Sequence, residues 1–296
     1  MISIEFDFPR YIAQRRGEVE QRARDGAAYA YAGERKLRRA LVSAKPVAIA
    51  IEATTRLWKS KARRDLLARS EKASDKTHAR IYDAARAAGR ALGVEPPAVV
   101  VPSGDFPVRA ATLGTDEEPV IVVAREAAER LDQRELVALL GHELGHVQNN
   151  QIFFATALFY LRHEAFFFVR WIVQPAVLAL SSWSRRAEVT CDRAALIAVR
   201  DLDVALSSMV KVELGEAATE GSDARAALAE LAEARRGVAV VADLFRGHPH
   251  LVKRARALEV FAESALYKRL IGAPEAGGMT AEEVDAKVSE IVKVLS

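Results

Sequence analysis

The amino-acid sequence predicts an α+β fold that is mainly α, with one small sheet near the middle of the chain. Two observations carry this prediction. Apolar residues recur at helical spacing over most of the 296 residues, and short runs of β-branched residues gather within residues 98–123. A chain of this length can bury a full hydrophobic core. We expect three parts: an N-terminal helical region (1–92), a central domain that holds the sheet (93–270), and a linker with a C-terminal helix (271–296).

The N-terminal region is rich in alanine and arginine and has helical periodicity with almost no strand signal. Its clearest element is an amphipathic helix over residues 77–92, which Gly93 would end because glycine readily adopts the left-handed conformation that closes helices. The basic run at residues 59–64 is expected to be a solvated helix face, since the formal net charge is only +3. We therefore expect no nucleic-acid partner. Contact of this run with a membrane surface is the weaker alternative.

Three short segments with β-branched residues predict the strands of a three-stranded sheet: residues 98–101, 108–113 and 120–123. Turn-forming residues follow the first two. Shortly after the third, residues 132–135 form a capping box that starts a helix. We expect the sheet to pack on this helix, where an edge strand could bind an extended peptide through backbone hydrogen bonds.

This helix contains the pattern H-E-x-x-H, with His142, Glu143 and His146. Residues four apart lie one turn apart on the same helix face, so both imidazoles can reach one metal ion, with Glu143 beside them to act on a water. Gly141 and Gly145 would let a backbone or a substrate approach closely, or they reflect plain close packing. Leucines at helical spacing predict that the helix is buried: Leu136, Leu139, Leu140 and Leu144. The alternative is a surface helix with two unrelated histidines.

A catalytic zinc keeps three protein ligands and one open position, so a third ligand must come from elsewhere. Glu188 is the best candidate, because it lies on a helix predicted from about Ser184, with Asp192 one turn later on the same face. Asp192 can then accept the ring N–H of a ligating histidine and orient it. Without the upstream motif, both residues would be interpreted as ordinary surface acids. We expect Cys191 to be buried and inert rather than a ligand.

Residues 151–183 are the most apolar part of the chain, with many aromatic residues. A helix that crosses a bilayer needs about 20 predominantly apolar residues. Polar or helix-breaking residues interrupt every window of that length here: Arg162, His163, Glu164, Arg170, Gln174 and Pro175. We expect an apolar helical hairpin over residues 152–183 that packs on the domain or lies in a membrane interface, with full spanning as the alternative. His163 is expected to be solvated or hydrogen-bonded, with a role as metal ligand as the weaker alternative.

Four features occur in order over about residues 95–260. They are the strand that ends at Val123, the helix with His142, Glu143 and His146, the helix with Glu188 and Asp192, and a late His248-Pro249 followed by Arg254. Together they resemble the HtpX / CAAX prenyl protease family of zinc metallopeptidases, which are gluzincins. The resemblance implies that the central domain has a zincin-like metalloprotease fold and is a zinc-dependent endopeptidase, with one Zn²⁺ per chain and a polypeptide as substrate.

The resemblance also implies roles for individual residues. The edge strand would bind the substrate, here through Val108, Arg109, Ala110, Ala111, Thr112 and Leu113. Glu143 would be the general base, which moves a proton from water to the leaving amine, and His248 or Arg254 would stabilise the tetrahedral oxyanion. Family members often carry membrane helices between the two zinc motifs, where this chain has the interrupted stretch 152–183.

Two rival hypotheses remain open. One is a non-catalytic or latent zinc-containing scaffold of chaperone-like kind, although a purely structural site needs no base such as Glu143 and typically has four protein ligands. The other is a membrane-embedded quality-control protease. A single cysteine excludes an internal disulfide, and residues 1–10 lack a basic segment followed by an apolar core. We therefore expect a cytoplasmic protein, with peripheral membrane association through residues 152–183 as the alternative. The sequence indicates neither the natural substrate nor the oligomeric state.

Overall fold

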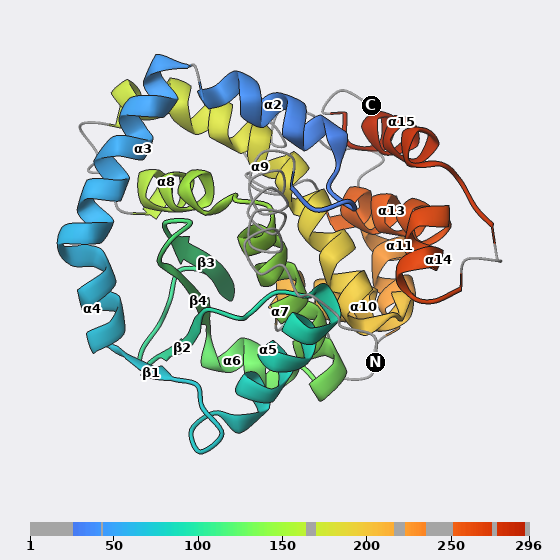
Figure 1. Ribbon diagram of the computed structural model, residues 1–296, viewed down its shortest axis with the longest axis horizontal. Coiled ribbons are helices and arrows are strands. Elements are labelled where there is room, and N and C mark those ends of the chain that lie inside the picture. Colours follow the sequence, from blue (N-terminus) through green and yellow to red (C-terminus); the bar gives the residue numbers. More distant parts are fainter. Residues whose placement is uncertain are drawn as a thin grey trace, which may run out of the picture.

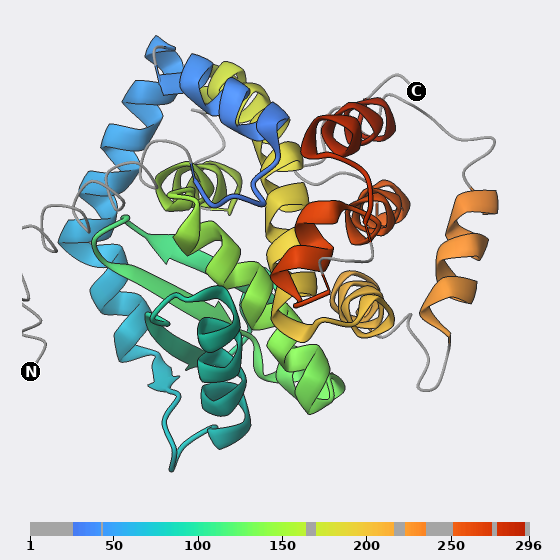
Figure 2. The ribbon, with the colours of Figure 1, turned by 45° about the vertical axis from the view of Figure 1, so that its right-hand side comes forward.

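The computed structural model describes residues 26–42, 44–163, 170–215, 223–234, 251–273 and 277–293. It confirms the mainly helical α+β fold. Two helices, α7 (Gln133–Gln148) and α9 (Arg170–Val199), run through the middle of the molecule, with the sheet on one side and the C-terminal helices on the other (Figure 1 and Figure 2). The other helices, in chain order, are α2 (Ala32–Val42), α3 (Lys45–Leu57), the π-helical η1 (Trp58–Ala62), α4 (Arg63–Ala68), α5 (Ala79–Leu92), α6 (Arg125–Arg130), α8 (Ile152–His163), α10 (Leu202–Leu214), α11 (Ala224–Ala234), α13 (Leu251–Ala262), α14 (Ala265–Leu270) and α15 (Ala281–Ile291).

Within the described residues the sheet has four strands in the order β1-β2-β4-β3. Their bounds are β1 (Ser70–Lys72), β2 (Ala98–Pro102), β3 (Ala110–Gly114) and β4 (Pro119–Val123). β1 pairs antiparallel with β2, β2 runs parallel to β4, and β3 pairs antiparallel with β4. β3 is therefore an edge strand. Both faces are covered, because Ile121 and Val123 belong to the main core, while Val120 and Val122 pack with Trp58 of η1.

The three predicted strands are confirmed, but the expected strand count was one too low. The additional strand, β1, reads Ser-Glu-Lys and contains no β-branched or aromatic residue, so no sequence pattern marks it. Its pairing with β2 is a tertiary contact. β3 also begins at Ala110 rather than at Val108, because the chain bends after Pro107, which lacks a backbone donor. Arg109 still pairs with the end of β4, since its carbonyl accepts from the N–H of Ala124 at 2.8 Å.

Helix α7 begins at the predicted capping box. The Asp132 side chain accepts a hydrogen bond from the N–H of Glu135, and the Glu135 side chain accepts one from the N–H of Asp132, each at 2.8 Å. Lys211 of α10 donates to both oxygens of Glu135 at 2.6 and 2.9 Å. The four leucines expected to bury this helix are buried. The prediction of a buried, firmly positioned helix is therefore confirmed.

Helices α7 and α9 meet at the two glycines of the H-E-x-x-H segment. A Cβ atom added to Gly145 would lie 3.0 Å from the Cα of Cys191 and from the Cβ of Ala194. One added to Gly141 would lie 2.7 Å from the Cβ of Ala198. Both distances are shorter than ordinary van der Waals contact, so these glycines allow the backbones of the two helices to approach closely.

The apolar segment 152–183 forms α8 and the first part of α9, while residues 164–169 lie outside the described residues. Helix α9 continues past Ser184 without a break, so the predicted helix start there was wrong; no turn or capping residue interrupts it. Helix α8 packs on the edge strand, where the N–H of Gly114 donates to Oγ1 of Thr156 at 2.8 Å. Among the helices described, none combines the length and the apolar character that crossing a bilayer requires.

The C-terminal helix α15 begins at the predicted capping box, residues 280–283, and lies beside α2 and α9. Asp285 of α15 accepts hydrogen bonds from Nη2 of Arg193 at 2.8 Å and from the N–H of Ala32 at 2.9 Å. Residues from all three predicted parts of the chain therefore meet at one place. The division of the chain into these three parts remains a prediction.

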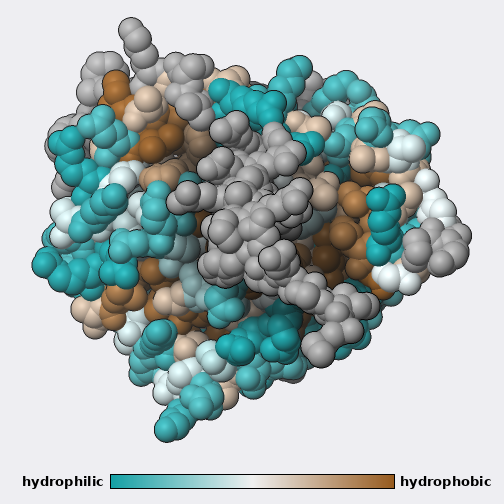
Figure 3. All heavy atoms as spheres, in the orientation of Figure 1, coloured by the Kyte–Doolittle hydropathy of each residue, from teal (hydrophilic) through white to brown (hydrophobic). Residues whose placement is uncertain are grey.

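Hydrophilic residues form most of the outer surface on the face shown in Figure 3, and hydrophobic residues are seen mainly in recessed areas. The large hydrophobic side chains exposed among the described residues are Ile49, Leu57, Leu178 and Leu270. Leu178 is the member of this set that lies within 152–183. Where side chains of this segment are described, at residues 152–163 and 174–183, most are buried or partly buried.

We expect Gly145→Ala to destabilise the fold, because its methyl group would be pressed against α9. Alanine favours a helix by about 1 kcal/mol over glycine, but overpacking a tight contact costs about 1–3 kcal/mol, so a net loss of about 1 kcal/mol in the free energy of unfolding is expected. Urea unfolding measures this loss. Gly104→Ala is the matched control, since nothing lies within 4 Å of its added Cβ. A Gly145→Ala protein as stable as the wild type would contradict the close packing of α7 on α9.

Candidate metal centre

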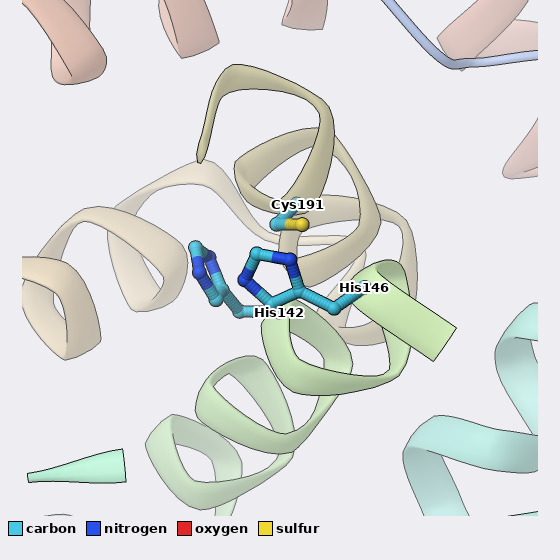
Figure 4. Close-up of side chains that lie close together, drawn as sticks. All are labelled: His142, His146 and Cys191. Carbon is cyan, nitrogen blue, oxygen red and sulfur yellow. The ribbon is translucent and has the colours of Figure 1, made fainter. Parts of the chain in front are cut away.

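Two histidine side chains of α7 lie together in the interior. The ring centroids of His142 and His146 are 5.3 Å apart, with an interplanar angle of 77°. Their side chains are only 13% and 10% exposed. Figure 4 shows the two rings side by side, with Cys191 of α9 close to the ring of His146. Ligand atoms of these three residues lie within 4.8 Å of one another, which is a spacing that could hold a metal ion.

The Nδ1 atom of each imidazole already has an acceptor beside it. His142 Nδ1 lies 3.0 Å from Oδ1 of Asp192, and His146 Nδ1 lies 2.9 Å from Oε1 of Gln151. When the ring is neutral, an acceptor at Nδ1 selects the tautomer that carries its hydrogen there. Each Nε2 then presents a lone pair, which is the form of histidine that binds a metal.

The carboxylate of Glu188 faces both Nε2 atoms. Its oxygens lie 3.4 Å from Nε2 of His142 and 4.0 Å from Nε2 of His146, and its side chain is 7% exposed. Two imidazoles and one carboxylate form a common donor set of catalytic zinc sites, with a fourth position left for water. The structure thus brings together the residues expected to bind zinc.

Arg254 of α13 holds the two acids of α9. Its Nε donates to Oδ2 of Asp192 at 2.9 Å, its Nη2 donates to Oδ1 of Asp192 at 2.6 Å, and its Nη1 lies 3.3 Å from Oε2 of Glu188. All three side chains are buried. Burial favours a raised pKa for Asp192, but Arg254 and His142 together lower that pKa below its ordinary value. Asp192 is therefore a fixed anion that can orient His142.

The site gathers negative charge. The buried carboxylates of Glu143, Glu188 and Asp192 can bring three negative charges, and Arg254 contributes one positive charge beside two of them. Burial lowers the pKa of His142, but Asp192 and Glu188 outweigh burial and raise it to about 10. The carboxylates thus favour positive charge between the rings. A divalent cation would supply that charge, so the residues present fit zinc.

Glu143 lies between the metal centre and the edge strand. The Oγ1 atom of Thr112 in β3 lies 2.7 Å from Oε2 of Glu143 and 3.1 Å from its backbone oxygen, so the hydroxyl donates to Glu143. A cavity of about 360 Å³ lies beside this pair. Its lining includes both histidines, Glu188 and all six residues of the predicted substrate-binding segment, 108–113.

Cys191 lies on the Nδ1 side of the His146 ring, whereas Glu188 faces Nε2. Its thiol donates to Oε1 of Gln151 at 3.3 Å, the same oxygen that contacts Nδ1 of His146. Burial and the nearby carboxylates raise the pKa of this thiol well above its ordinary value, so it stays protonated, whereas a metal-binding cysteine is a thiolate. The third metal ligand could be Cys191 or Glu188. Glu188 is the more suitable donor, because it is a carboxylate whereas the thiol of Cys191 stays protonated.

Gln151 and the contact of Thr112 with Glu143 were not anticipated from the sequence. Asn150 adopts a left-handed φ of 51°, which turns the chain after α7 and brings Gln151 back under His146. No sequence motif marks either contact. His163 lines the cavity and contacts the ring of Phe159, at 4.9 Å between centroids. His248 and Pro249 lie outside the described residues.

Comparison with known proteins agrees with this geometry. The family model of peptidase family M48 matches residues 71–262. The chain is also 33% identical over 131 residues to the plastoglobule-localized metallopeptidase 48, chloroplastic, of Arabidopsis thaliana. That alignment covers 43% of this chain and 38% of the relative, so the chain spans less than two-fifths of the relative's length. No solved structure matches.

The family match covers more than half of the chain and includes strands β2 to β4, both histidines of α7 and both acids of α9. The predicted resemblance to this group of zinc metallopeptidases is confirmed: the chain belongs to peptidase family M48.

Proposed function

We propose that this chain is a zinc-dependent endopeptidase with one Zn²⁺ held by His142, His146 and Glu188. One observation carries the proposal: the two Nε2 atoms and the Glu188 carboxylate converge within 4.0 Å, beside Glu143 and the edge strand β3. When bound, zinc supplies a Lewis acid that polarises the substrate carbonyl and lowers the pKa of water to about 7.

In this proposal Glu143 is the group that moves protons. It accepts a proton from the attacking water and passes it to the leaving amine, with the Thr112 hydroxyl fixing its carboxylate at 2.7 Å. Asp192 and Gln151 orient the two imidazoles through Nδ1. Arg254 is hydrogen-bonded to Asp192 and lies beside Glu188, so we assign it the role of fixing these acids. Stabilisation of the oxyanion by His248 or Arg254 remains a prediction.

The edge strand supports binding of an extended peptide. In an antiparallel pair, alternate residues direct their N–H and C=O groups toward the same neighbour. The carbonyl of Arg109 points to β4, and the N–H of Gly114 points away from β4 to Thr156. By this alternation the backbone groups of Ala110 and Thr112 face away from β4, and we propose that they pair with the substrate. Thr156 closes the binding edge at Gly114.

A latent or non-catalytic zinc scaffold is the second candidate function. Its support is the burial of the centre, where Glu143 is 4% and His146 is 8% exposed. The position of Glu143, between the metal ligands and the edge strand, favours the catalytic role, because a structural zinc site has no use for a base there. A cytoplasmic location and a peripheral membrane contact through residues 152–183 stay predictions.

Glu143→Gln tests the catalytic role. We expect the variant to bind one equivalent of zinc and to lose about 100- to 10,000-fold in kcat/KM toward a quenched-fluorescent peptide, because glutamine cannot accept the proton. Zinc is measured by elemental analysis of the same samples. If the wild type binds zinc but cleaves no peptide, the scaffold hypothesis gains support. Loss of zinc in Glu143→Gln would contradict the assignment of Glu143 as a non-ligand.

A pair of substitutions in α9 tests which third residue binds the metal. Glu188→Gln removes a proposed ligand, and we expect zinc affinity to fall by at least 100-fold, measured by competition with a chelating dye. Cys191→Ala is the matched change on the same helix, and its zinc affinity should stay within a few-fold of the wild type. The reverse pattern would assign the sulfur of Cys191 to the metal instead.

Proton release on zinc binding provides an independent check. In the metal-free protein the raised pKa of about 10 keeps His142 protonated at neutral pH, whereas burial lowers the pKa of His146. Zinc requires neutral imidazoles, so its binding at about pH 7 should release about one proton, from His142. Calorimetry in buffers of different ionisation enthalpy counts the protons. Because zinc-bound water with a pKa of about 7 can add part of a proton, the count is compared between the wild type and Cys191→Ala. A higher count in the wild type would indicate that the Cys191 thiol also ionises and binds the metal.

A further inference from the structure

A single face of α8 forms part of the cavity lining. Ala155, Leu158, Phe159 and Arg162 all line the cavity, and their spacing of three, four and seven residues places them on one helix face. The first three are apolar. Trp183 of α9 lines the same cavity and packs against Phe154 of α8. Arg162 is therefore the last residue, in chain order, of this face of α8, and the residues before it on the face are apolar.

Arg162 is held in place by a neutral partner. Its Nη2 donates to Oγ of Ser181 in α9 at 2.7 Å. Among the described residues no carboxylate lies within 4 Å of its guanidinium. Partial burial and the positive charge of nearby Arg185 lower the pKa of Arg162, while the charge of Glu188 acts in the opposite direction. Among the described residues, the cation therefore lines the cavity without a carboxylate partner of its own.

Arg254, which lines the same cavity, differs from Arg162 in this respect. Arg254 is bound to Asp192 and lies beside Glu188, so its charge is already matched by acids of the protein. A partly buried cation such as Arg162 gains most from an added carboxylate, because hydrogen bonds between ionised groups are stronger than neutral ones. The apolar side chains beside it can also pack on the methylene groups of an acidic side chain.

The direction of the edge strand predicts which part of a substrate reaches Arg162. β3 runs from Ala110 to Gly114, and Gly114 is the end that contacts α8 through Thr156. A peptide that pairs antiparallel with β3 runs the opposite way. Its residues before the scissile bond then lie toward α8, and its residues after the bond lie toward Arg109.

We propose that Arg162 forms a specificity site for an acidic side chain, glutamate or aspartate, located on the N-terminal side of the scissile bond. The guanidinium binds the carboxylate, and Leu158 and Phe159 contact the aliphatic part of the side chain. This inference rests on the proposed peptidase function, which it extends by naming a class of substrate.

The test uses pairs of quenched-fluorescent peptides that differ only by Glu or Gln at one of the three positions before the cleaved bond. With the zinc-loaded full-length protein, we expect kcat/KM to be about 10-fold higher for the Glu peptide at one of these positions, the factor that corresponds to about 1.4 kcal/mol. In Arg162→Gln the ratio should fall to about one. In Arg162→Glu a peptide with Lys at that position should become the preferred substrate. Ser181→Ala, which keeps the charge of Arg162 but removes its partner, should retain part of the preference.

Binding separates this proposal from the peptidase function. The same peptides, labelled for fluorescence anisotropy, are titrated with the zinc-loaded Glu143→Gln protein with and without Arg162→Gln. Tighter binding of the Glu peptide that depends on Arg162 supports the specificity site even if no peptide is cleaved. Cleavage of Glu and Gln peptides at equal rates would overturn the specificity site and leave the peptidase function intact. A preference that survives in a folded Arg162→Gln protein, or one for glutamate only after the cleaved bond, would also overturn it.

Discussion

The close contact between α7 and α9 is the constraint on which the site depends. Gly141 and Gly145 leave no side chain between the helices, and Cys191, Ala194 and Ala198 complete the contact with small side chains. At this short separation, side chains that project to the cavity side of each helix meet within hydrogen-bond distance. His142 and Asp192 therefore meet at 3.0 Å although fifty residues separate them in sequence. A larger residue at either glycine would move the two halves of the metal centre apart.

Once the helices are this close, electrostatics decides the arrangement of the remaining groups. Burying Glu188 and Asp192 together is costly unless cations compensate them, and Arg254 supplies one positive charge from α13. It leaves the Nε2 side of the histidines with an excess of carboxylate. The raised pKa of His142 has the same origin as the proposed affinity for zinc, since a proton and a metal ion compete for the same negative site. On the Nδ1 side of His146, the acceptor is the uncharged amide of Gln151.

The sequence predicts the parts of this arrangement that have local patterns. The capping box at residues 132–135, the H-E-x-x-H spacing and the apolar strands depend on neighbours along the chain, and the structure contains them where expected. Contacts without a local pattern were missed: β1 owes its conformation to pairing with β2, and Gln151 reaches His146 because of the φ of Asn150. Arg254 was predicted only in part. The sequence pattern after His248-Pro249 indicated a functional residue, but the hydrogen bonds of Arg254 to Asp192 are seen only in the fold. The continuity of α9 through Ser184 likewise follows from packing rather than from any signal at that residue.

The distribution of charge along the cavity follows from which arginine reaches which acid. If Arg162 paired with Glu188, it would occupy the carboxylate that the metal needs and would leave no charged group for a substrate. Ser181 prevents this by holding the guanidinium toward α9 at 2.7 Å, and Arg254 already lies beside Glu188. The cavity lining therefore combines the carboxylates beside the histidines with Arg162 on α8 and Arg109 at the start of β3. Since arginines line the cavity toward both ends of the strand, charge alone does not set the direction of an extended peptide, and the polarity of the edge strand decides it.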